Sequence, residues 1–212
     1  METETEMLDK EVDLTPSPAD VPTDASSTSS DRNFTSNPYY FEIACAVILL
    51  AASIIFGRVF AIKIPILSVS LGFVPLMIAG VVLKPYTTVL VFVLSDIIGA
   101  LLFPHGAFFI GFTFVALFNG LSCGLLLGWH NLKSKEFKLD TKYLIRIVVA
   151  SFLIVLVGDL FLNTWMISIT QGKSWAILFP PRVIKELVFF ALHIAVLIPI
   201  AKVYESLRTS HD

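Results

Sequence analysis

Four polar side chains that could bind a ligand lie inside long apolar runs of this 212-residue chain. Asp96 and Asn119 lie in the run 90–120, and Asp159 and Asn163 lie in a later one. An ionised carboxylate in hydrocarbon costs roughly 2.5–3.5 kcal/mol on insertion scales. These side chains therefore need partners or a ligand, and their pattern favours a polar site inside a membrane-embedded helical bundle.

Basic and aromatic side chains flank the same runs. A cavity lined by bases would attract an anion, and aromatic faces beside polar groups suit a planar ligand. The bases are Arg58, Lys63, Lys173, Arg182 and Lys185, and the aromatic residues are Phe103, Phe108, Phe109, Phe112, Trp165, Trp175 and Phe179. The expected ligand is flat, forms hydrogen bonds and carries negative charge at one end.

Each candidate also has a structural explanation. Asp96 and Asp159 could pair with nearby bases, and Asn119 could bridge two helices. His193 lies deep in the last apolar run and is expected to be a core histidine with its hydrogen bonds satisfied. His105 follows a proline in a turn between two runs, where a ligand contact is plausible. Interfacial anchoring is the alternative for Trp165, Trp175 and Lys63.

The motifs of common enzymes are missing from the sequence. It contains no H-E-x-x-H, no G-x-S-x-G and no Gly-rich phosphate loop. Ser95 beside Asp96 is the nearest approach to a nucleophile with a base, but adjacent helix residues do not face each other. Cys45 and Cys123 fit no metal-site spacing. We therefore expect no enzyme, no catalytic residue, no metal and no cofactor; a membrane scaffold is the other class considered.

Composition identifies a membrane protein. The chain is 56% hydrophobic and 15% charged, whereas soluble domains are about 45–50% apolar and about 25% charged. Residues 1–37 hold nine of the seventeen acids and are rich in Thr, Ser and Pro. Such a segment cannot bury enough apolar surface to order itself. We expect a disordered acidic tail over 1–37 and a membrane domain over 38–212.

Six apolar segments follow the tail, so the predicted fold class is an all-α membrane protein with six transmembrane helices. A helix needs about 20 residues to cross the hydrocarbon core. The second segment is shorter, and we expect it to be tilted, kinked near Pro75 or shielded by its neighbours. Glycines four residues apart in the fourth segment predict close helix packing. The segments are about 40–60, 72–83, 86–103, 107–129, 143–169 and 181–205.

Loop charge predicts the orientation. The connection between the fourth and fifth segments carries Lys133, Lys135, Lys138, Lys142 and Arg146. Basic loops stay in the cytoplasm, which places both termini inside the cell and the protein in the plasma membrane. The buried polar groups then gather in the outer half of the bilayer.

Two motifs resemble a known family. Ser95-Asp96 is followed by Gly99 and by the stretch Phe-Pro-x-Gly at 103–106, and Pro181-Arg182-x-x-Lys185 opens the last segment. Over roughly 45–205 the chain resembles the folate-specific S components, the substrate-binding subunits, of energy-coupling factor (ECF) vitamin transporters. The resemblance implies an S-component-like bundle that takes up a vitamin from outside. Its implied partners are folate or a related pterin, the lipid bilayer, a transmembrane coupling subunit and two ATPases, with no nucleic acid.

The resemblance also implies site residues. Asp96 would accept hydrogen bonds from the pterin, and Arg182 or Lys185, or else Arg58, would hold the glutamate carboxylates. An A-x-x-x-A face for docking the coupling subunit has Val47 and Ala51 in the matching register. An S component for thiamin, riboflavin or another pterin is the alternative. The expected ligand contacts are Arg58, Asp96, Phe103, Phe109, Asn163, Trp165, Arg182 and Lys185, together with His105 from its place in the turn.

Overall fold

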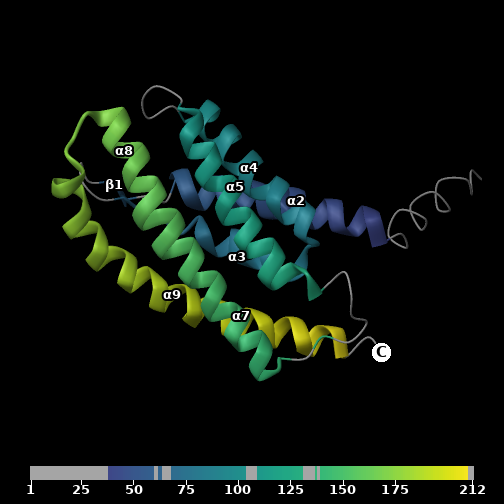
Figure 1. The fold of residues 1–212 in the computed structure, drawn as a ribbon. Helices are drawn as coiled ribbons and strands as arrows, with labels where there is room; N and C mark the ends of the chain where they lie inside the picture. The colour runs from purple at the N-terminus through teal and green to yellow at the C-terminus, as the bar shows by residue number, and fades with distance from the viewer. Residues whose placement is uncertain are drawn as a thin grey trace, which may run out of the picture. The chain divides into compact units, whose positions relative to one another are not determined.

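The computed structural model describes residues 38–59, 62–63, 68–103, 109–130, 137 and 139–209. Most of these residues are helical (Figure 1), which confirms the predicted all-α class. The acidic tail predicted over 1–37 and the candidate His105 lie outside the described residues.

Six apolar helical segments follow one another along the chain, close to the predicted bounds. Within the described ranges five are long and apolar enough to cross a membrane, and the sixth, α3, has only 10 residues. A short pair of antiparallel strands lies between the first two segments, and the sequence did not predict it. The strands are β1 (Ile62–Lys63) and β2 (Ser68–Val69), with two residues each. The helices are α2 (Pro38–Ile54) with the π-helical η1 (Ile55–Val59); α3 (Phe73–Val82); α4 (Pro85–Leu102); α5 (Ile110–Cys123) with η2 (Gly124–Gly128); α7 (Thr141–Phe152) with η3 (Leu153–Asn163) and α8 (Thr164–Gln171); and α9 (Trp175–Thr209).

The short helix α3 is shielded by its neighbours, which was one of the three possibilities that we predicted for this segment. Met77, Ala79 and Val81 are at most 1% exposed. Pro75 is the third residue of α3, and a proline is tolerated in the first turn because its missing N–H would have no partner there. The Thr88 hydroxyl donates to the Ala79 carbonyl at 3.1 Å, which ties α4 to α3.

The last helix begins earlier than predicted. We expected it near residue 181, but α9 begins at Trp175 and carries Pro180 and Pro181 in its second turn. The Trp175 ring stacks on Phe179, four residues along, with centroids 4.2 Å apart. This contact supports an additional turn, and the two prolines remove only the hydrogen bonds to the carbonyls of Ala176 and Ile177, two exposed residues.

The glycine repeat packs α5 and η2 against α4 and the end of α3, which confirms the predicted close packing. A Cβ added at Gly120 would lie 2.9 Å from Phe92 Cβ. One at Gly124 would lie 2.8 Å from the Pro85 carbonyl oxygen, and one at Gly128 would meet the Leu83 carbonyl oxygen at 2.9 Å. Backbone atoms form two of these three contacts, so these helices approach too closely for a larger residue.

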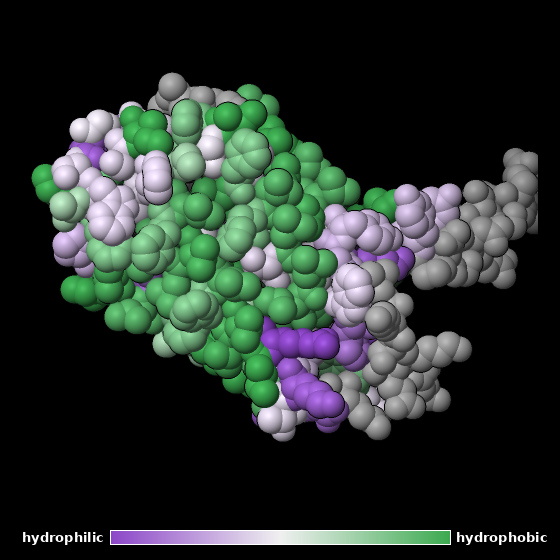
Figure 2. Space-filling view, viewed as in Figure 1, coloured by the Kyte–Doolittle hydropathy of each residue, from purple (hydrophilic) through white to green (hydrophobic). Residues whose placement is uncertain are grey.

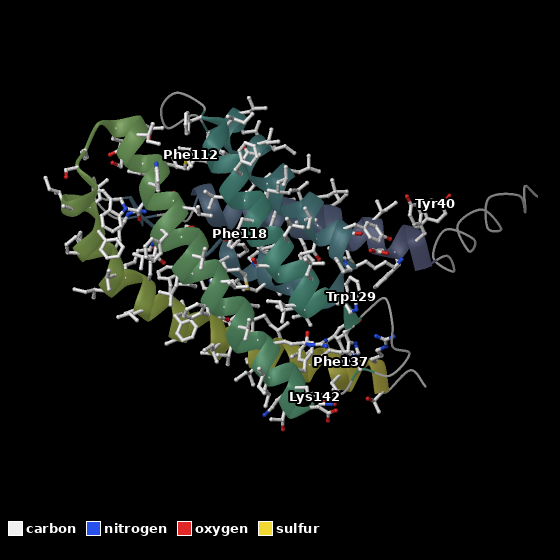
Figure 3. The ribbon with its side chains drawn as sticks, in the orientation of Figure 1. Tyr40, Phe112, Phe118, Trp129, Phe137 and Lys142 are labelled. Atoms are coloured by element: carbon white, nitrogen blue, oxygen red, sulfur yellow. The ribbon has the colours of Figure 1, made fainter. Side chains whose placement is uncertain are left out.

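A core cluster fills one half of the bundle. It lies toward the end at which Phe137 and Lys142 are labelled in Figure 3. Hydrophobic residues cover most of the visible face outside the bundle ends (Figure 2), as expected of a chain surrounded by lipid. The core cluster consists of Met77, Val81, Phe92, Cys123, Leu127, Phe137, Tyr143, Ile147, Ala150, Ile154, Leu197 and Ala201.

From Phe41 onward, Ser53 is the one fully buried residue of α2, and the middle of the helix packs through Leu49 and Leu50 on a second small cluster formed by Ala79, Leu83 and Val91. Near its start the Glu42 carboxylate pairs with Lys84 Nζ at 2.8 Å and accepts from the Thr87 hydroxyl at 2.7 Å. This hydrogen-bonded pairing with Glu42 raises the pKa of Lys84. Near its other end the hydroxyls of Ser53 and Ser95 lie 2.7 Å apart.

Candidate ligand-binding site

A cavity of about 340 Å³ opens in the half of the bundle away from the core cluster. Pockets of about 300–1,000 Å³ are typical of small-molecule sites. Met77, Phe92 and Ile154 belong both to its lining and to the core cluster, so the core closes its inner end. The lining residues are Ser53, Ile54, Gly57, Ser70, Gly72, Phe73, Leu76, Met77, Phe92, Ser95, Asp96, Phe112, Val115, Ala116, Asn119, Ile154, Asp159, Asn163 and His193.

One wall of the cavity carries Asp96. The Thr113 hydroxyl on α5 donates to Asp96 Oδ2 at 3.1 Å. Ser95, the neighbouring residue on α4, meets Ser53 of α2, and both serines line the cavity. Phe112, one residue before Thr113, adds an aromatic ring and lies at the α8 end of α5 (Figure 3).

A second wall carries Asp159 and Asn163, both on η3. Asn119 Nδ2 on α5 donates to Asp159 Oδ1 at 3.2 Å, so Asn119 bridges two helices as one expectation held. Gly158 makes room for this amide, because a Cβ there would overlap the Asn119 side chain. Asp159 and Asn163 share one face of η3 and present a carboxylate and an amide to the same cavity.

Charged residues of α9 stand behind this second wall. Arg182 is 4% exposed and donates to the Thr164 hydroxyl at 3.0 Å. Lys185 pairs with Glu186 at 2.9 Å. The charges of Glu186, Lys185 and Arg182 all act on Asp159. Two bases and two acids therefore form a nearly neutral buried cluster, and no arginine or lysine is among the described residues that line the cavity.

His193 also lines the cavity; the expected burial is confirmed, but the expected hydrogen bonds are not found among the described residues. Its side chain is 2% exposed, as expected of the core. Neither ring nitrogen, however, has a hydrogen-bond partner among the residues described. The imidazole packs against the Phe73 ring, with centroids 4.7 Å apart, and more loosely against Phe189. Its apolar sequence context hid this group, whose ring lines the cavity while both nitrogens are buried without a partner among the described residues.

The predicted aromatic contacts lie in several places. Phe103 follows α4 and is 37% exposed. Phe109 precedes α5, and its ring meets Phe112 edge-on at 6.1 Å. Trp165 is 62% exposed and lines a separate apolar surface pocket with Phe161 and Trp175.

The remaining predicted residues also divide by position. Asp96 and Asn163 line the cavity, whereas Arg182 and Lys185 stand behind its second wall. Arg58 lies in η1, next to the cavity residue Gly57. On α2, the candidate docking residues Val47 and Ala51 are exposed.

The α9 spacing contains a signal that sequence reasoning missed. The buried residues Arg182, Glu186, His193, Leu197 and Ala201 follow intervals of four and seven residues, which place them on one face of a helix. Reading that face as one column would have placed His193 between the charged cluster and the apolar core.

The arrangement is suited to binding a small polar molecule. Carboxylate, amide, hydroxyl and imidazole groups converge on one cavity with aromatic and aliphatic walls. No group of acidic, histidine or cysteine side chains that could hold a metal ion was found among the described residues. Fold and site together define a membrane-embedded helical bundle with a polar cavity in one half.

The comparisons identify the family. The chain belongs to the substrate-specific components of ECF transporters, whose family model matches residues 41–201.

Similar proteins include two curated folate transporters. The chain is 30% identical over 149 residues to the folate transporter FolT of Clostridium novyi (strain NT), covering 70% of this chain and 81% of that protein. It is 29% identical over 160 residues to FolT of Leuconostoc mesenteroides subsp. mesenteroides, covering 73% and 81%. A crystal structure of FolT bound with folic acid matches with a TM-score of 0.65 and 26% identity, over 76% of this chain and 92% of that one.

Proposed function

We propose that this chain binds folate, or a closely related pterin, on the outer side of the cell membrane for ATP-driven uptake. The cavity with its two acidic walls carries the proposal, since it lies in a fold that matches a folic-acid-bound FolT. A transmembrane coupling subunit and two ATPases supply the energy. The chain itself binds and presents the vitamin and performs no covalent chemistry.

The ring system of folate suits the first wall. Its amino group and ring N–H are donors, and a carboxylate such as Asp96 accepts such paired hydrogen bonds well. Asn163 and Phe112 line the same cavity and supply an amide and an aromatic face. Arg58 is the candidate for the glutamate tail, next to the cavity residue Gly57.

Arg182 and Lys185, the bases behind the second wall, are proposed to act through their charge. Arg182 and Lys185 hold positive charge close to Asp159 and reduce the repulsion that two cavity carboxylates would exert on an anionic ligand. They also remain candidates for the tail carboxylates after a side-chain rearrangement. The aromatic residues Phe103, Phe109 and Trp165 are proposed as ring contacts near the mouth, in company with His105.

Docking of the coupling subunit is proposed on α2. Val47 and Ala51 are exposed there, and α2 and its continuation η1 contribute Ser53 and Gly57 to the cavity wall. A partner on this helix would therefore sit directly behind the bound ligand. We further propose that residues 1–37 form an acidic tail separate from the membrane domain 38–212, with both termini in the cytoplasm.

Ligand titration of the purified chain in detergent tests this function. We expect folic acid to bind far more tightly than thiamin or riboflavin, and Asp96→Asn to weaken folic acid about tenfold or more, because hydrogen bonds to a charged group contribute about 1.5–3 kcal/mol. Asp140→Asn is the matched control, since Asp140 is an exposed aspartate before α7. Preference for riboflavin or thiamin, or equal effects of the two variants, would contradict the proposal.

A further inference from the structure

Among the described residues that line the cavity, His193 is the one titratable side chain without a hydrogen-bond partner. At 2% exposed it lies in the middle of α9, and both ring nitrogens are unpartnered among the described residues. A neutral imidazole carries one N–H donor and one acceptor. Buried polar groups in proteins nearly always have partners, so the absence of one here needs a physical explanation.

The surroundings of His193 argue against a simple packing role. Leu197, one turn further along α9, belongs to the core cluster, and Phe73 packs on the imidazole. A leucine or phenylalanine would fill such a position without the desolvation cost of two polar atoms. The cost is offset if a bound molecule supplies the missing partner.

The same surroundings indicate which part of a ligand lies there. Met77 and Phe92 line the inner end of the cavity, and no lysine or arginine is among its described lining residues. A carboxylate in this place would be desolvated without a counter-charge, which is costly. A flat neutral ring with acceptor atoms on its edge would pack on the apolar walls and accept a hydrogen bond.

We propose that His193 is a specificity-determining ligand contact, whose imidazole N–H donates to an acceptor atom, a carbonyl oxygen or ring nitrogen, on the heteroaromatic end of the ligand. This inference rests on the proposed function, because it assigns one end of folate to the inner part of the cavity. Asp96 accepts from the donors of the ring edge, and His193 donates to an acceptor of the same ring. Together they distinguish a ring that carries both kinds of group from one that carries a single kind.

The test compares His193→Phe with His193→Gln. Phenylalanine keeps the ring packing and removes the donor, so folic acid should bind about tenfold more weakly or worse. Glutamine retains an N–H donor and should recover most of the affinity. In competition with folic acid, pterin-6-carboxylate should lose affinity for the Phe variant by a similar factor, and 4-aminobenzoyl-glutamate should not.

Thermal unfolding without ligand separates a ligand contact from a structural role. Because His193 has no described partner, His193→Phe should leave the unliganded protein as stable as wild type or more stable. The control His130→Phe removes another histidine with an unpartnered nitrogen, which packs on Phe137 outside the described cavity lining. It should leave folic acid affinity unchanged.

The outcomes are distinguishable. Failure of the wild-type chain to bind folic acid would contradict the proposed function itself. Wild-type binding that His193→Phe leaves unchanged would overturn only the inference. A Phe variant that unfolds at a lower temperature without ligand, with glutamine giving no recovery of affinity, would also overturn it, since His193 would then be structural.

Discussion

At the scale of single residues, Asp159 depends on a neighbour of its own chain for its position. Asn119 holds its carboxylate from α5, and the amide fits only because residue 158 has no side chain. This support is steric as well as polar. A cavity carboxylate held in this way meets a ligand in one orientation, which limits the entropy lost on binding.

Gly158→Ala should disturb that arrangement without touching the ligand. The added methyl overlaps the Asn119 amide, so we expect a stability loss of about 1–3 kcal/mol, the usual cost of overpacking, and weaker folic acid binding. Thermal unfolding and ligand titration would measure the two effects. Adding Asn119→Ala should recover stability by removing the overlap, but not affinity; recovery of both would show that the hydrogen bond to Asp159 is unimportant.

The sequence identified some cavity residues and missed others for a physical reason. Asp96 and Asn163 stood out because charge and amide groups are costly in an apolar run. His193 did not, since a neutral imidazole is tolerated in a core once its nitrogens are bonded, and only coordinates reveal that no described residue bonds them. Trp165 was predicted to face the ligand, yet it is mainly exposed.

At the scale of elements, the α5–η2 helix connects the two walls of the cavity, because it packs on α4 and holds Asp159 of η3 through Asn119. Asp96 lies on α4, whereas Asn119 is on α5 immediately before Gly120, the first of the three glycines. The glycines bring the backbones of α4 and α5–η2 together near the core cluster. The cavity lies between the helices on the side away from that cluster.

Gly124→Ala should therefore destabilise the bundle by about 1–3 kcal/mol, as overpacking usually does. The added methyl meets the backbone of Pro85, which cannot move aside as a flexible side chain can. Unfolding in detergent with increasing denaturant would measure the loss. The control Leu125→Ala changes a neighbouring residue that is 49% exposed; a larger loss for this control would contradict the proposed packing.

Hydropathy predicted the order and type of the helices but not their detailed course. Six segments stood out because the hydrocarbon core requires long apolar runs, and α4 and α5–η2 follow the predicted bounds closely. The π-helical η3 was not predictable from composition, and it changes which residues share a face between α7 and α8. The early start of α9 depends on the Trp175–Phe179 stack, a contact that hydropathy does not register.

At the scale of the whole molecule, charge distinguishes the two ends of the membrane domain. Lys142 lies at the end that holds the core cluster (Figure 3), and the charges of Arg146 and Arg208 act on His130. Burial, with these two charges, lowers the pKa of His130. Basic residues favour the cytoplasmic side, so the cavity would lie toward the outside.

Cysteine labelling in intact cells tests this orientation. In a Cys45→Ala background, with Cys123 buried and unreactive, Ser174→Cys between α8 and α9 should react with a membrane-impermeant maleimide. Thr209→Cys at the end of α9 should react only after the cells are permeabilised. Reversed labelling of these two exposed positions would place the cavity on the cytoplasmic side.

The three side chains shared by the cavity floor and the apolar cluster, Met77, Phe92 and Ile154, have a further consequence. They make the cavity a closed binding site and not a channel. A solute that rests on them meets tightly packed apolar side chains before it reaches the other leaflet. Vesicles that contain this subunit alone should therefore bind at most one molecule of folic acid per protein and should not let folic acid cross the membrane. Passage of a bound solute to the other leaflet would therefore require these three side chains to separate from the packed core.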